Sequence, residues 1–185
     1  MNKENEASSV PFQKAVHALW ASIFCMNEQA EEYVKGHEKF TDASRNAWEN
    51  EFANACAQVC LKIVDVIREG DLDEVWLKKH VLKTPFPAPA DRMSMLSVRA
   101  EGACRALKKL DLAKEHPKEE SNREASTLIQ KLIHDLIWSI AMTCRDFPWL
   151  FEAIEKKRAE WLLKNAGPRR YNNDLLKCSL RAIEG

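Results

Sequence analysis

The sequence predicts an all-α protein, a single-domain irregular bundle of six or seven helices. Three observations support this prediction. Glycine occurs only five times in 185 residues, and Gly36, Gly70 and Gly167 stand where apolar-periodic segments stop, as glycines at helix ends do. Apolar residues recur at three- and four-residue steps in the long segments. No stretch alternates apolar and polar residues over the length of a β-strand.

The N-terminal part is expected to hold three helices behind a flexible segment of residues 1–9. Helices are predicted over 10–35, 42–69 and 71–83. Short glycine-containing links join them, so the first two should form a long antiparallel hairpin, and residues 10–83 a hairpin plus a short helix. The first apolar stripe comprises Phe12, Val16, Leu19, Ile23, Met26, Ala30 and Val34. The second comprises Trp48, Phe52, Ala55, Cys56, Val59, Ile63, Val66 and Ile67.

A proline-rich connector, TPFPAPAD at residues 84–91, follows this part. Proline fixes φ and disfavours helix in the residue before it, so this segment should be a short stiff link. It is interpreted as a packed crossover loop, with a ligand for a proline-recognising groove as the alternative. Residues 92–185 are then expected to pack on the same core, with helices at 91–114, 119–146, 148–166 and 171–183.

Composition limits the class of protein. The N-terminus MNKENEASSV lacks a basic region followed by an apolar run, and no window is apolar enough for a membrane span, so a cytoplasmic protein without membrane contact is expected. The six cysteines are scattered without a CxxC pair, which favours reduced, core-packing thiols. No cofactor is predicted.

The helix expected over 119–146 contains a pair, His134 and Asp135, that resembles the metal-binding dyad of HD-type phosphohydrolases. Both side chains should point away from the main Ile/Leu stripe of that helix. The glycine and basic residue usual after the motif are missing, and other His and Asp residues show no supporting spacing. Glu28 and Glu31 resemble the ExxE motif of helical nucleotide pyrophosphohydrolases, but the second acidic pair is absent. No catalytic or metal-binding residue is predicted.

A second strip on the same helix contains His134, Trp138 and Met142, roughly opposite the Ile/Leu stripe. Two interpretations fit a helix with two apolar faces. It is central in the bundle and covered on both sides, or Trp138 is exposed and anchors a partner, since tryptophan is enriched at interface hot spots. Trp20, Trp48 and Trp161 fall on or beside core stripes and are expected to be structural, whereas Trp76 fits no single face.

Charge is distributed unevenly although the net charge is zero. Residues 1–75 carry 14 acidic and 7 basic side chains, and residues 76–185 carry 14 acidic and 21 basic ones. The basic residues late in the chain could contact phosphates or an acidic protein surface, or they could face the acidic hairpin, within one chain or across a homodimer. The late basic cluster comprises Lys156, Lys157, Arg158, Lys164, Arg169, Arg170, Lys177 and Arg181.

Together these observations favour a non-enzymatic protein that acts through protein–protein interaction, as a small inhibitor, adaptor or regulator. In general character the chain is similar to small bacterial and phage immunity and defence-inhibitor proteins, with which it shares no motif. Nucleic-acid binding by the basic cluster is the second hypothesis, and an HD-like metal phosphohydrolase is the third. The predicted partner-binding residues are Trp76, Trp138, Met142, Arg169 and Arg170.

Overall fold

The computed structural model describes residues 3–70, 92–113 and 119–164, and in these ranges the chain is all-α without a β-strand. The predicted fold class is confirmed. The number of six or seven helices is not, because the helices expected at 71–83 and 171–183 and the connector at 84–91 lie outside the described residues. The elements are α1 (Lys3–Gly36), a short 3-10 turn η1 (His37–Lys39), α2 (Asp42–Glu69), α4 (Arg92–Ala113), α5 (Glu119–Asp146) and α6 (Pro148–Lys164).

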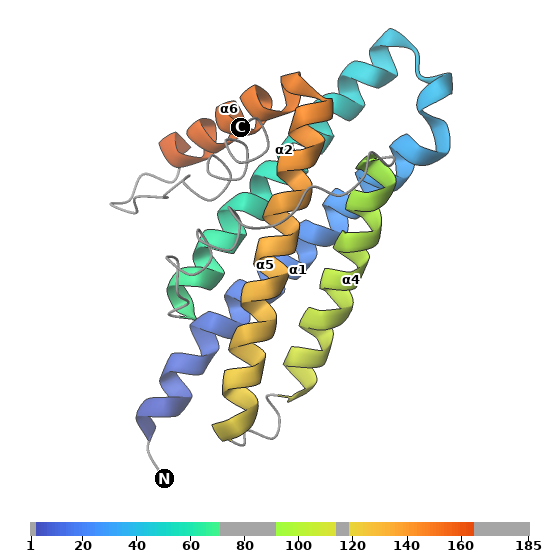
Figure 1. Ribbon diagram of the computed structural model, residues 1–185. Helices are drawn as coiled ribbons and strands as arrows, with labels where there is room; N and C mark the ends of the chain where they lie inside the picture. The colour runs from blue at the N-terminus through green and yellow to red at the C-terminus, as the bar shows by residue number, and fades with distance from the viewer. Residues whose placement is uncertain (1–2, 71–91, 114–118, 165–185) are drawn as a thin grey trace.

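The helices lie side by side in an elongated bundle (Figure 1). α1 packs between α2 and α4, and α4 in turn packs against α5. α6 follows α5 after a sharp turn and packs against both α2 and α5. α1 nevertheless has a side that no described helix covers, which carries the exposed residues Trp20 and Phe24.

The helix bounds agree closely with the sequence-based expectation. α2 and α5 cover the predicted residues, and the described bounds of α4 and α6 lie within the predicted ranges. α1 begins at Lys3, seven residues before the predicted start of the first helix. The apolar stripe starts only at Phe12, and the polar residues before it carry no periodic signal that would reveal a helix.

Local interactions fix the helix ends. The Thr41 side chain caps α2 by accepting a hydrogen bond from the Ser44 backbone N–H at 3.2 Å. At the other end of α2, a Cβ on Gly70 would lie 2.6 Å from the Phe12 ring and 2.9 Å from the Val66 carbonyl oxygen. Glycine is therefore what allows the end of α2 to approach α1 so closely.

An aromatic cluster closes one end of the bundle, where α1, η1, the start of α2 and the α5–α6 junction meet. Trp48 stacks on Phe52 with ring centroids 5.0 Å apart, and Tyr33 stacks on His37 at 4.3 Å. The Trp48 indole also donates a hydrogen bond to the Gln29 backbone carbonyl at 2.9 Å, which ties α2 to α1. The cluster consists of Tyr33, His37, Phe40, Trp48, Phe52, Phe147 and Trp149.

Candidate interaction surface

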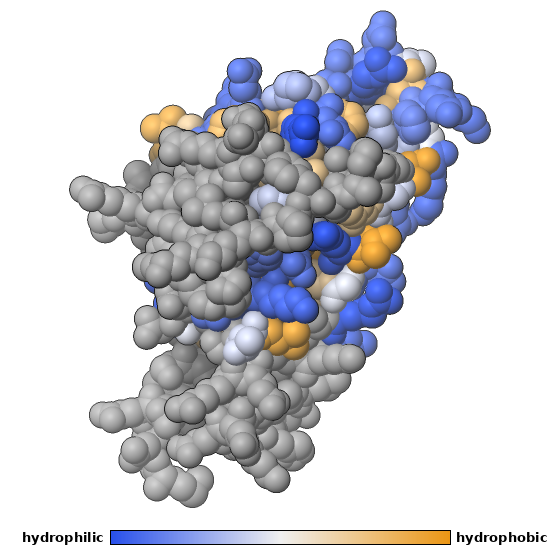
Figure 2. Space-filling model, viewed as in Figure 1, coloured by the Kyte–Doolittle hydropathy of each residue, from blue (hydrophilic) through white to orange (hydrophobic). Residues whose placement is uncertain are grey.

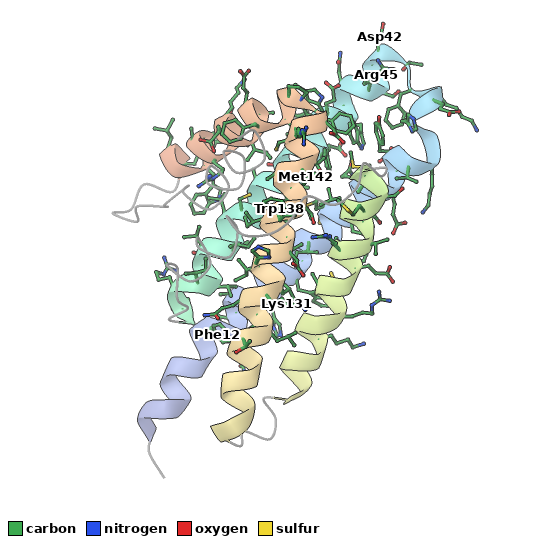
Figure 3. All side chains as sticks on the ribbon, viewed as in Figure 1. Phe12, Asp42, Arg45, Lys131, Trp138 and Met142 are labelled. Atoms are coloured by element: carbon green, nitrogen blue, oxygen red, sulfur yellow. The ribbon has the colours of Figure 1, made fainter. Side chains whose placement is uncertain are left out.

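The two predicted anchors on α5 lie in the interior. Trp138 is 1% exposed and Met142 is fully buried, and every residue from 136 to 144 is buried as well. Figure 3 shows both side chains on α5 within the bundle. In this conformation neither side chain offers surface, and their contact with a partner stays a prediction. Of the two interpretations of this helix, the burial fits the one in which both of its faces are covered.

The basic cluster is only partly described. Lys156 and Lys164 on α6 are exposed and Lys157 is partly buried. Arg158 is 3% exposed, and its Nη1 donates to a Glu155 carboxylate oxygen at 3.2 Å, so it does not belong to a phosphate-binding surface. The other residues predicted for partner or nucleic-acid binding, Trp76, Arg169, Arg170, Lys177 and Arg181, lie outside the described residues.

The His–Asp dyad is a local pair. His134 Nδ1 lies 3.2 Å from a carboxylate oxygen of Asp135, with the histidine side chain largely buried and the aspartate side chain about half exposed. Within the described residues, no group of three or more His, Cys, Asp or Glu side chains is placed to hold a metal ion. A phosphohydrolase centre needs further ligands around this dyad, and that part of the chain does not supply them.

A surface that the sequence reading missed lies on α1. Residues 15–27 contain no Asp, Glu, Lys or Arg, yet only one side of this stretch enters the core. Trp20 is 44% exposed and Phe24 is 53% exposed, so Trp20 is not the purely structural residue that was expected. The uncharged run was the signal available in the sequence, because an exposed helix face ordinarily carries charges. We call the exposed residues Lys14, His17, Trp20, Ala21, Phe24, Cys25, Glu28 and Glu32 the outer face of α1.

Contacts with α4 hold one edge of the outer face in place. The Trp20 side chain hydrogen-bonds to the Cys104 thiol; burial nevertheless raises the pKa of Cys104 to about 11. The Ser97 hydroxyl donates to the Asn27 amide oxygen at 2.7 Å, and the Asn27 amide nitrogen donates to Glu31 at 2.9 Å. The indole of Trp20 is thus fixed on one side and open to solvent on the other.

The other edge of the outer face runs into a groove between α1 and α2 of about 390 Å³. No lysine or arginine lines it. The Gln29 side-chain amide nitrogen donates a hydrogen bond to a Glu51 carboxylate oxygen at 3.4 Å. Glu28 and Glu51 are the charged side chains of its lining, so the groove carries negative charge over a largely apolar surface. Its lining comprises Ala21, Ser22, Cys25, Glu28, Gln29, Glu51, Asn54, Ala55 and Gln58.

The thiols divide by exposure. Cys25 on the outer face is exposed, whereas Cys56, Cys60 and Cys144 are buried between helices. Burial raises the pKa of Cys60 to about 11 and raises the pKa values of Cys56 and Cys144 well above the ordinary range. The buried three are thus protonated and unreactive at neutral pH, since the thiolate is the nucleophile.

No helix in the described ranges is long and apolar enough to cross a membrane.

Comparison of the chain with protein-family models, with curated proteins and with solved structures finds no match in any of the three.

Proposed function

We propose that this chain is a non-enzymatic cytosolic interaction protein, an inhibitor, adaptor or regulator, that binds a protein surface through the outer face of α1. The observation that carries the proposal is the exposed aromatic pair Trp20 and Phe24 in the middle of an uncharged helical stretch. The two residues are four positions apart and so are neighbours on one side of the helix.

The chemistry of this pair suits protein recognition. Large aromatic side chains supply most of the energy at many interfaces, and tryptophan is the most enriched among hot spots. Trp20 is already held by Cys104, so less side-chain freedom is lost on binding. On the side of the molecule shown in Figure 2, hydrophobic residues of the described part form small separate patches among hydrophilic ones, which is ordinary for a soluble surface.

The test is affinity capture of the tagged chain from lysate of its native cell, with and without nuclease. A matched set compares the wild type, the double variant Trp20→Ala/Phe24→Ala, and Val98→Ala. Val98 is 65% exposed on α4 and lies off the outer face, so it controls for loss of any exposed apolar side chain.

The proposal predicts a stoichiometric protein that survives nuclease, is retained by Val98→Ala and is lost by the double variant. Equal recovery with the wild type and the double variant would refute the role of the outer face. Recovery that disappears with nuclease would favour the second hypothesis, nucleic-acid binding, with Lys156 and Lys164 of α6 as the first exposed cations to neutralise.

A further inference from the structure

Five of the exposed positions on α1 lie along one side of the helix at a regular spacing. Lys14, His17, Ala21, Phe24 and Glu28 are all exposed and are separated by steps of three, four, three and four residues. This is the spacing by which one helix presents a continuous seam to another helix. The seam extends over about 21 Å of helix, at about 1.5 Å per residue. α1 thus carries two seams, one packed into the core and one facing solvent.

Charges stand only at the two ends of this outer seam. Lys14 is at the N-terminal end, Glu28 and Glu32 are at the C-terminal end, and no charged residue lies on α1 between Lys14 and Glu28. Two copies of the seam placed antiparallel would bring Lys14 of each copy against Glu28 of the other. A parallel arrangement would bring like charges together, which is unfavourable. The seam is therefore electrostatically complementary to its own antiparallel copy.

The middle of the seam has the shape that such a pair requires. Ala21 lies seven residues from both Lys14 and Glu28, and its small side chain allows two helix axes to approach to about 8 Å. The Phe24 side chain of each copy would then pack on the helix of the other copy, next to His17 of that other copy. An interface built about a two-fold axis must be self-complementary in this way, because the same patch serves both subunits.

We infer that the outer face of α1 binds the outer face of a second copy of this chain, antiparallel, about a two-fold axis next to Ala21. The inference rests on the proposed function in using the same face, and it goes further by naming the occupant.

The experiment is sedimentation velocity of the full-length chain over a series of concentrations from about 1 to about 300 μM, a range that brackets micromolar association. The wild type should sediment increasingly as a dimer. Phe24→Ser should weaken dimerisation at least about tenfold, as expected for an interface aromatic residue, whereas Val98→Ser should not change it. Circular dichroism of each variant checks that the helices remain folded.

Charge exchange tests the orientation. Lys14→Glu and Glu28→Lys should each weaken the dimer, and the double variant Lys14→Glu/Glu28→Lys should restore it, because both end contacts re-form with reversed sign. A wild type that stays monomeric throughout, a dimer indifferent to Phe24→Ser, or a double variant no better than the single ones would each overturn the inference.

These outcomes can be separated from failure of the proposed function. If the chain is monomeric but captures a different protein, and this capture depends on Trp20 and Phe24, the proposed function is supported and the dimer is refuted. If the dimer forms as predicted while the Trp20→Ala/Phe24→Ala variant still captures the same other proteins from lysate as the wild type, the dimer is supported and the proposed function of the face is refuted.

Discussion

α1 and α5 have the same kind of sequence and different surroundings. Each has a core stripe and a second strip that includes a tryptophan, Trp20 in α1 and Trp138 in α5. The second strip of α5 is covered, so that residues 136–144 are buried all round, whereas the second strip of α1 faces solvent. An apolar face in a sequence therefore shows that a helix needs a partner, and the fold decides whether that partner lies within the chain.

Truncating the two tryptophans tests this contrast most strongly. Trp138→Ala should lower the free energy of unfolding by about 3–5 kcal/mol, because a large side chain leaves the core and the cavity does not refill. Trp20→Ala at 44% exposure should cost about 1 kcal/mol or less in the monomer. Urea unfolding at low protein concentration measures both. Similar losses in the two variants would mean that the outer face of α1 is part of the core.

The thiols give a second contrast, which depends on pH. The buried Cys60 has a pKa of about 11 in the folded state, against an ordinary value of 9.0. Between these values the unfolded chain has released the thiol proton and the folded chain still holds it. Stability should therefore fall as pH rises above 9, by about 1.4 kcal/mol per pH unit for this thiol, and be unaffected by it below that pH.

Two matched variants isolate that contribution. Cys60→Ala should reduce the fall of unfolding free energy between about pH 9 and 11 by about 1.4 kcal/mol per pH unit and leave the contributions of Cys56, Cys104 and Cys144, whereas Cys25→Ala, at an exposed position of α1, should leave the slope as in the wild type. Measurement is by urea unfolding at a series of pH values. If Cys60→Ala keeps the full wild-type slope, the thiol is not shielded from solvent as described.

The smallest expected effect concerns the buried hydroxyls of α5. Ser139 donates to the Asp135 carbonyl at 2.7 Å, and Thr143 donates to the Ser139 carbonyl at 2.8 Å. Both groups are thus satisfied within their own helix and need no partner elsewhere. Ser139→Ala and Thr143→Val should each change the unfolding free energy by less than about 1 kcal/mol. A much larger loss would show that these hydroxyls connect α5 to a neighbouring helix.

The sequence was sufficient for the all-α class and for the bounds of α2 and α5, and insufficient for the surface. The bounds of α2 follow from local chemistry, since Thr41 caps one end and Gly70 ends the other. Burial of Trp138 could not be derived, because two apolar faces on one helix fit both a central position and an exposed anchor. Arg158 was grouped with its lysine neighbours by charge alone, and only the packing of α6 on α2 reveals that it points inward.

The outer face of α1 was missed for a related reason. Trp20 lies beside the predicted core stripe of its helix, and the charged clusters and the tryptophans off the core stripes lie elsewhere in the sequence. The informative signal was a lack of charge from residue 15 to residue 27, which has meaning only once the open side of α1 is known.

The aromatic cluster at the end of the bundle also makes the molecule easy to follow optically. Its edge-on ring contacts, such as that of Trp48 with Trp149, join segments more than 100 residues apart in the chain, so its near-ultraviolet circular dichroism depends on tertiary packing and is lost when that packing loosens. The half-exposed Trp20 lies outside the cluster, and its emission responds to whatever covers the outer face. The protein therefore carries two separate spectroscopic signals: the aromatic cluster reports tertiary packing, and Trp20 reports binding at the outer face.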